Sequence, residues 1–116
     1  MDKEITLKLP ITETYREFVS KTKNKKIEGV YRISFECGSF YIGRTSNFYG
    51  RIYNHVTLSD NNNCKNLSPK QKRMLMAINQ KEYVKFEMLT NNERMERNII
   101  SKNKANELCL NISNGH

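Results

Sequence analysis

The residues best suited to chemistry are two tyrosines, an arginine and a histidine one helical turn apart, and a glutamate much later in the chain. They are Tyr31, Tyr41, Arg51, His55 and Glu96. Hydrolysis of a phosphodiester needs a base for the attacking water, cationic or hydrogen-bonding groups on the phosphate, and a carboxylate that holds a divalent metal ion. The chain offers a candidate for each of these parts.

Arg51 and His55 are four residues apart, so on a helix their side chains project from one face. A guanidinium keeps its charge and can grip a phosphate through two N–H groups, and an imidazole titrates near neutral pH and can relay a proton. His55 is the only histidine inside the sequence, because His116 is the last residue. The same pair is also typical of a solvated basic helix, and tyrosines are ordinary strand residues, so the elements around them matter.

The elements that would carry the tyrosines form a predicted β-hairpin. Apolar and polar residues alternate from Gly29, Cys37 and Gly38 mark a turn, and a second apolar run begins at Phe40. Ser46 or Asn47 is then a good cap for a helix from Phe48 to Val56, whose apolar residues recur every four positions.

Two more helices and a strand follow. Residues 57–67 are rich in Asn, Ser and Asp and predict a loop, after which Ser68-Pro69 starts a helix that ends near Asn79. Lys70, Lys72 and Arg73 make one side of this helix basic. A strand is predicted from Tyr83 to Leu89. Thr90 and Glu93 have the spacing of a capping box for a last helix.

Residues 1–28 form a predicted N-terminal extension, and residues 29–116 form the core of a single compact domain. The extension has a short apolar stretch around Pro10, and Tyr15, Phe18 and Val19 predict a short helix after Thr12 or Thr14. Residues 21–26 are polar and basic, which fits either a solvated linker or a loop that contacts phosphates. The extension could cover a sheet edge, contact DNA or pair two chains.

Composition limits the classes of function. The 116 residues suffice for one domain, and 20 Lys and Arg against 12 Asp and Glu give a formal charge of +8, which attracts polyanions. The three cysteines form no CxxC pair, so we expect reduced thiols rather than a zinc site. Without a long apolar run or a signal-peptide pattern, we expect a cytoplasmic protein of a cell or an infected host, with no membrane partner.

Six short motifs in order make the chain resemble the GIY-YIG nuclease family over about residues 29–112. They are Gly29-Val30-Tyr31, Tyr41-Ile42-Gly43, Arg51, His55, Glu96 and Leu110-Asn111. The resemblance is closest to the catalytic domain of phage homing endonucleases. It implies an α/β (α+β) fold in which a small central three-stranded antiparallel sheet is flanked by helices, in agreement with the order of the predicted elements. Val30 replaces the usual isoleucine of the first motif.

The resemblance also implies roles for the residues. Tyr31 would act as the general base or assist it, Tyr41 would orient water or phosphate, and Arg51 would stabilise the charged phosphate. His55 would relay a proton or contact the phosphate. Glu96, which matches the family position better than Glu93 does, would bind one Mg²⁺ or Mn²⁺ ion.

Three further residues are expected to support the site or to bind the substrate. Gly43 would let the end of its strand approach the substrate or a helix, and Arg44 is either a phosphate contact or a surface arginine. Asn111 would hold backbone near the site rather than take part in chemistry.

The resemblance implies a metal-dependent DNA endonuclease, associated with a phage or a mobile element, that cuts one strand per active site. A double-strand break would need a dimer, two binding events or reorientation on the duplex. The protein could act as a homodimer or with a protein partner, and no residue excludes RNA as a substrate. The rival interpretations are a non-cleaving or partner-activated nucleic-acid-binding module on a nuclease scaffold and a basic structural protein of a larger assembly.

Overall fold

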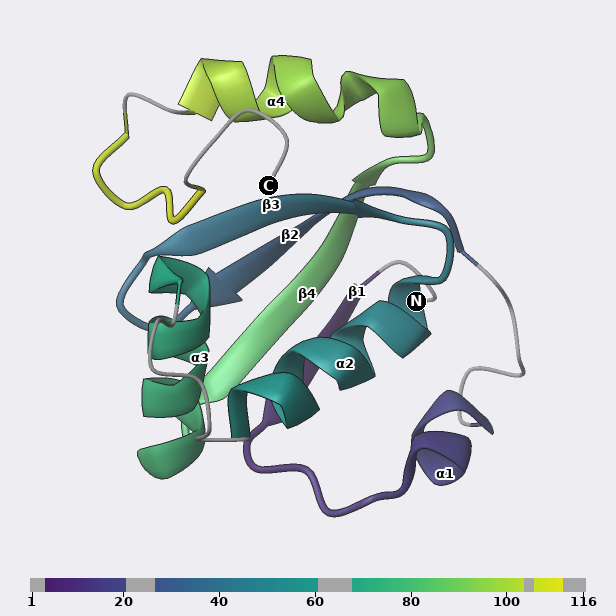
Figure 1. Ribbon diagram of the computed structural model, residues 1–116, viewed down its shortest axis with the longest axis vertical. Helices are drawn as coiled ribbons and strands as arrows, with labels where there is room; N and C mark the ends of the chain where they lie inside the picture. Colours follow the sequence, from purple (N-terminus) through teal and green to yellow (C-terminus); the bar gives the residue numbers. More distant parts are fainter. Residues whose placement is uncertain (1–3, 21–26, 61–67, 104–105, 112–116) are drawn as a thin grey trace.

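A four-stranded antiparallel sheet forms the middle layer of the protein (Figure 1). The structure is a computed structural model that describes residues 4–20, 27–60, 68–103 and 106–111. The strand order is β1-β4-β2-β3. The strands are β1 (Glu4–Lys8), β2 (Gly29–Phe35), β3 (Phe40–Thr45) and β4 (Tyr83–Thr90).

Helices cover both faces of this sheet, three on one face and one on the other (Figure 1). The first face carries α1 (Tyr15–Ser20), α2 (Phe48–Asp60) and α3 (Pro69–Asn79), and the second carries α4 (Glu96–Asn103) after a short 3-10 turn, η1 (Glu93–Met95). Among the described residues, none of the helices has the length and apolar character needed to cross a membrane.

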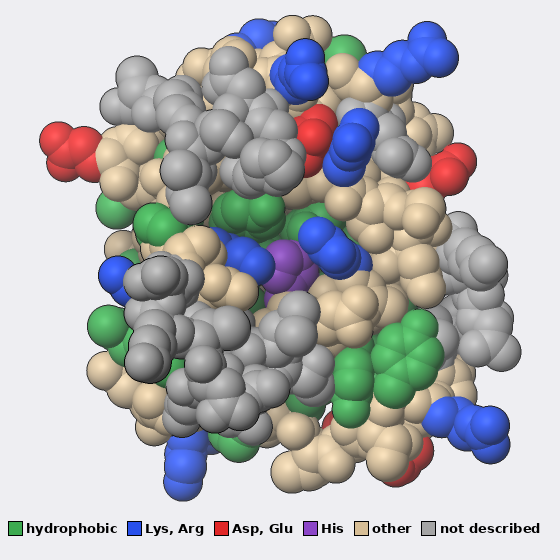
Figure 2. Space-filling model, viewed as in Figure 1, with side chains coloured by type: hydrophobic (Ala, Val, Ile, Leu, Met, Phe, Trp, Pro, Cys, Tyr) green, Lys and Arg blue, Asp and Glu red, His purple; other side chains and the backbone are tan. Residues whose placement is uncertain are grey.

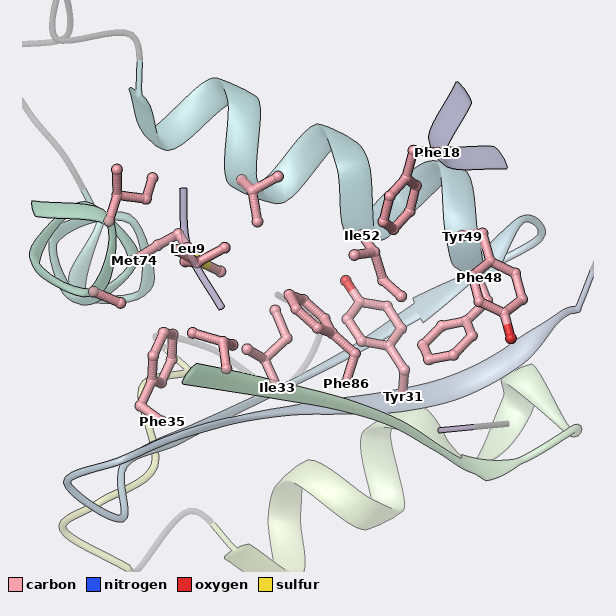
Figure 3. Packing of buried hydrophobic residues seen from close by; sticks show 14 residues of the cluster. Leu9, Phe18, Tyr31, Ile33, Phe35, Phe48, Tyr49, Ile52, Met74 and Phe86 are labelled. Atoms are coloured by element: carbon pink, nitrogen blue, oxygen red, sulfur yellow. The ribbon is translucent and has the colours of Figure 1, made fainter. Parts of the chain in front are cut away.

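The larger apolar cluster lies between the sheet and helices α1, α2 and α3 (Figure 3). On β2, Tyr31, Ile33 and Phe35 point into it, whereas Val30 joins a smaller cluster on the α4 face. This alternation follows from the two-residue period of a strand. Aromatic and aliphatic side chains from several elements fill the larger cluster, which includes Phe18, Phe48, Ile52, Met74 and Phe86. The sheet therefore holds Tyr31 from below while α2 packs over it.

The predicted class of fold is confirmed, and so are the hairpin and the start of α3. Ser68 caps α3 as expected, because its Oγ accepts a hydrogen bond from the Gln71 N–H at 3.2 Å. The Gln71 Oε1 in turn accepts a hydrogen bond from the Ser68 N–H at 2.9 Å, which completes a capping box.

The prediction of three strands is wrong, because β1 adds a fourth at the edge of the sheet. Ile5 and Leu7 pack against the larger apolar cluster, and β1 pairs along β4 from Glu4 opposite Glu87 to Lys8 opposite Tyr83. Part of the N-terminal extension thus covers a sheet edge, one of the three roles considered for it. The basic segment 21–26 lies outside the described residues.

Two predicted boundaries are also wrong. The helix expected to end at Val56 continues to Asp60, so the first four residues of the predicted loop are helical, and residues 61–67 lie outside the described part. Thr90 does not cap the last helix, because it ends β4 and its Oγ1 accepts from the Asn92 N–H at 3.2 Å. The Asn92 side chain instead accepts from the Arg94 N–H at 3.0 Å.

The outer edge of β3 is covered by the segment that follows α4. The Phe40 N–H donates to the Leu108 carbonyl at 2.9 Å, and the Leu110 N–H donates to the Phe40 carbonyl at 2.8 Å. Two residues further along β3, the buried side chain of Asn111 takes over: its Oδ1 accepts from the Ile42 N–H at 2.9 Å, and its Nδ2 donates to the Ile42 carbonyl at 2.7 Å. One amide group therefore satisfies both backbone groups of Ile42.

Replacement of Asn111 by alanine should lower the free energy of unfolding by about 2 kcal/mol, because both backbone groups of Ile42 lose their partner in a buried place. Urea denaturation followed by circular dichroism measures this change. Asn98→Ala, at an exposed position on α4, is the control and should change stability by no more than about 0.5 kcal/mol. Equal effects of the two substitutions would show that the Asn111 amide does not stabilise β3.

Candidate active site

A buried pair of side chains forms the centre of the site. The Tyr31 hydroxyl of β2 lies 2.7 Å from His55 Nε2 of α2, and both side chains are almost fully buried, at 1% and 4% exposure. Tyr41 of β3 packs edge-on against the same histidine, with ring centroids 5.9 Å apart. The strand pair and α2 thus bring together three residues that are separated by up to 24 positions in the sequence.

Arg51 and Glu96 complete the group. Arg51 lies one turn before His55 on α2, close enough to the Tyr31 phenol to lower its pKa. Glu96 is the first residue of α4 and is 6% exposed, and its charge acts on both Tyr31 and Tyr41. Since α4 lies on the opposite face from α2, the group is assembled from both sides of the sheet at β3, its edge strand.

Gly43 makes room for the Tyr31 ring. The two residues are opposite each other in the β2–β3 pairing, and a Cβ atom at position 43 would lie 2.5 Å from the Tyr31 hydroxyl oxygen and 2.7 Å from Cζ. Real Cβ atoms do not approach other atoms so closely, so the ring can lie here only over a glycine. The close neighbour of Gly43 is therefore the Tyr31 ring, whereas we had expected the substrate or a helix.

Gly29, the glycine of the first motif, is required by the conformation and packing of the backbone. Its φ of +143° is rare for residues with a side chain, and a Cβ atom would lie 2.0 Å from the Thr90 carbonyl oxygen. The pairing of β2 with β4 shifts register between Val30 and Tyr31, one residue further on. Gly29 thus permits the irregular start of β2 from which Tyr31 projects.

Both tyrosines are held in their protonated form. Burial raises the pKa of Tyr31 above its ordinary value, and the neighbouring Tyr41 and Glu96 raise it further, whereas the hydrogen bond and the charge of Arg51 lower it. Burial also raises the pKa of Tyr41, against the opposing charge of Arg51. Near neutral pH each phenol therefore carries its proton.

His55 is neutral at the same pH. Burial lowers its pKa well below the ordinary value for histidine, and the positive charges of Lys70 and Arg51 lower it further. The Lys70 ammonium lies 3.2 Å from His55 Nδ1 and 5.4 Å from the centroid of the Tyr41 ring. Burial, followed by the charge of Arg51, lowers the pKa of Lys70 to about 8.

Lys70 was not among the predicted site residues, since the sequence placed it only on the basic side of its helix. Lys72 is exposed, but Lys70 is half-buried against His55, and the Arg73 side chain is 11% exposed and bonded to Glu82 at 2.6 Å. One sequence signal could have identified Lys70. A lysine in the first turn of a helix faces the positive end of the helix dipole, so its presence directly after Ser68-Pro69 calls for another partner.

A cationic pocket adjoins these residues. It has a volume of about 280 Å³ and is lined by Arg44, Thr45, Ser46 and Arg51. Arg44 is mostly exposed, and its Nε lies 3.7 Å from Glu96 Oε1. On the face drawn in Figure 2, a histidine side chain lies between groups of lysine and arginine side chains. Guanidinium and hydroxyl groups suit phosphate oxygens, although Thr45 and Ser46 were not among the predicted residues.

The residues present fit one kind of metal ion. No group of three or more His, Cys, Asp or Glu side chains gathers within the described residues, which does not fit a structural zinc site. Glu96 supplies one buried carboxylate beside the cationic pocket. Mg²⁺ is commonly bound through one or two carboxylates, with water and substrate phosphates as its other ligands. Glu96 could hold such an ion together with a phosphate.

Gly43→Ala should cost about 1–3 kcal/mol of stability, because the new methyl group overlaps the Tyr31 phenol. In a Tyr31→Leu background, whose side chain is shorter, the same substitution should cost much less. Urea denaturation of the four proteins gives the coupling between the two positions. A Gly43→Ala cost that is equal in both backgrounds would show that the Tyr31 ring is not what requires the glycine.

One family model covers the elements that form the candidate site. The model of the GIY-YIG catalytic domain matches residues 27–108, most of the chain, including Tyr31, Tyr41 and Glu96. No curated protein and no solved structure matches the chain. The matched region contains β2, β3, β4, α2, α3 and α4, so it supplies every element around the candidate site. The chain belongs to the GIY-YIG catalytic domain family, which supports a function of the nuclease type.

Proposed function

We propose that this protein is a metal-dependent DNA endonuclease that hydrolyses phosphodiester bonds, one strand per active site. The observation that carries the proposal is the convergence of Tyr31, His55 and Arg51 with the buried Glu96 beside a cationic pocket. A protein that only binds DNA needs the positive charge. It does not need a buried phenol, imidazole and carboxylate that touch or act electrostatically on one another. Its place of action would be the cytoplasm of a cell or of a phage-infected host.

Binding would begin with the cations at the pocket. Arg44 and Arg51 would contact phosphate oxygens, and the formal charge of +8 would favour the approach of a polyanion. Arg51 acts on the Tyr31 phenol and also lines the pocket. A phosphate held by Arg51 would therefore lie next to the phenol oxygen.

In the proposed reaction, the oxygen of a water molecule bonds to phosphorus and the bond from phosphorus to the 3′ oxygen breaks. The water loses a proton, the leaving oxygen gains one, and the ends are a 5′-phosphate and a 3′-hydroxyl. The additional negative charge on the phosphate would be stabilised by Arg51, which cannot lose its own charge. Tyr41 would help to orient water or phosphate from β3.

Tyr31 would receive the proton of the attacking water. Its raised pKa means that the phenol must first lose its own proton to the solvent, and the negative charge of Glu96 is one cause of the raised value. Binding of a divalent cation at Glu96 would polarise the phosphate and stabilise the leaving 3′ oxygen. Neutralising the Glu96 charge would also favour the phenolate form of Tyr31, which the positive charge of Arg51 already favours.

Cleavage should require both the metal ion and Glu96. Purified protein is incubated with supercoiled and linear duplex DNA, and with RNA for comparison, in Mg²⁺, in Mn²⁺ and in chelator. Nicking of DNA that occurs with the metal ions and is lost in Glu96→Gln is the expected result, because the amide no longer supplies a carboxylate ligand. Glu107→Gln, at an exposed position, should cut at the rate of the original protein.

Two results of this assay would contradict the proposal. Binding of DNA without any cutting would favour the nucleic-acid-binding module on a nuclease scaffold. Cutting that continues in chelator would show that cleavage does not need the metal ion, and cutting that continues in Glu96→Gln would show that it does not need this carboxylate.

Arg51→Ala should lower the single-turnover rate of cleavage by about 10²–10³-fold and change DNA affinity much less, because a group on the scissile phosphate acts mainly in the transition state. Arg97→Ala removes the same charge from an exposed position on α4 and is the control for general attraction. Equal losses of rate and affinity in Arg51→Ala would reassign Arg51 to docking of the DNA.

A further inference from the structure

Lys70 stands against the centre of the site without belonging to any of the six motifs that mark the family resemblance. It comes from the first turn of α3, and its ammonium reaches the ring nitrogen of His55 that faces away from Tyr31. The Tyr41 ring lies on another side of the same ammonium, 5.4 Å away, where it attracts the cation. The lysine is thus held between an aromatic face and an imidazole.

This contact restricts which nitrogen of His55 carries its proton. A neutral imidazole has one N–H group, and the other nitrogen can only accept. An ammonium group has three N–H donors and no lone pair, so Nδ1 must be the accepting nitrogen when it faces charged Lys70 at 3.2 Å. The single proton of neutral His55 is therefore left on Nε2.

The direction of the bond to Tyr31 follows from that assignment. With the proton on Nε2, the 2.7 Å contact is an N–H that donates to the Tyr31 oxygen. The positive charge of Arg51 also acts on the phenol from α2 and lowers its pKa. Because the phenol oxygen accepts from His55, its own O–H has to point away from His55.

We propose that Lys70 is a positioning residue that fixes neutral His55 in the Nε2–H tautomer, so that His55 donates to Tyr31 and does not take its proton. This reverses the relay role expected for His55 from the family resemblance. The bond donated by His55, together with the charge of Arg51, would favour the phenolate form of Tyr31 over the phenol, as a base at this position needs. The statement on the tautomer stands on the contacts alone, and its effect on cleavage rests on the proposed function.

The tautomer can be observed without any activity. Long-range ¹H–¹⁵N correlation spectra distinguish the two neutral forms of histidine and the imidazolium. In His116→Gln, His55 is the only histidine, so its signals need no further assignment. Spectra recorded near pH 7, below the pKa of about 8 for Lys70, should show the Nε2–H form. An Nδ1–H form or an imidazolium would overturn the proposal.

The role of Lys70 is tested in the same background. Lys70→Met keeps an unbranched side chain but removes the charge and the donors, so the Nδ1–H form should become populated. Lys72→Met, on the exposed side of the same helix, should leave the spectrum unchanged. An unchanged Nε2–H pattern in Lys70→Met would overturn the role of Lys70. If this variant does not fold, Lys70→Arg provides the test. It keeps the donors, so it should retain the Nε2–H form. Loss of that form in folded Lys70→Arg would count against the proposal.

Cleavage assays on the same variants test whether the tautomer of His55 affects the reaction. Lys70→Met should lower the single-turnover rate by roughly ten- to hundredfold, the usual effect of removing a residue that orients a site ligand. Its DNA affinity should match that of Lys72→Met, since each variant loses one charge, and Lys70→Arg should recover most of the rate. Equal rates for Lys70→Met and Lys72→Met would show that the tautomer has no part in cleavage. Absence of cleavage in the original protein would contradict the proposed function but leave the spectra as evidence on Lys70.

Discussion

The candidate site depends on one steric constraint, the passage of the Tyr31 ring over Gly43. A side chain at position 43 would occupy the place of the phenol, and without that passage Tyr31 could not lie under α2 and meet His55 at 2.7 Å. The remaining parts of the site are arranged around the phenol oxygen. Arg51 and His55 reach it from one helix, and the Glu96 charge acts on it from a helix on the other face of the sheet. The two glycines of the motifs therefore serve different ends, since Gly29 fits the backbone at the start of β2 and Gly43 fits a side chain.

Burial gives this small group of residues its electrostatic character. Tyr31 and His55 are both kept neutral, one by a raised and the other by a lowered pKa, while the charges that influence them come from Arg51, Lys70 and Glu96. In the proposed reaction, a phosphate and a divalent cation would bind beside these charges and would change how strongly the phenol holds its proton. The covered outer edge of β3 also helps to hold the site in place. Asn111 satisfies the backbone of Ile42, which lies between Tyr41 and Gly43, so the strand that carries both of these residues is held on its outer edge.

Much of the fold was predictable because it follows from local patterns. The alternation after Gly29 gave the hairpin, and the cap at Ser68 with proline after it gave the start of α3. Three features were not predictable in this way. The pairing of β1 with β4 joins residues about 80 positions apart, and such pairing depends on which sheet edge is free rather than on local sequence. The extension of α2 to Asp60 overrides the loop composition of that segment. The inward direction of Lys70 depends on the partner offered by His55. The residues of the candidate site could be selected from the spacing of the motifs, but the space at Gly43 and the contact of Lys70 required coordinates.

The part of the Tyr31 phenol in cleavage can be measured in Tyr31→Phe by single-turnover cleavage of duplex DNA, with DNA affinity and unfolding measured on the same samples. This substitution removes only the hydroxyl group and leaves the ring over Gly43. We expect a folded protein that binds DNA with nearly unchanged affinity and has lost almost all of its cleavage. Cleavage at the original rate would show that the phenol oxygen, around which the site is assembled, has no part in the reaction.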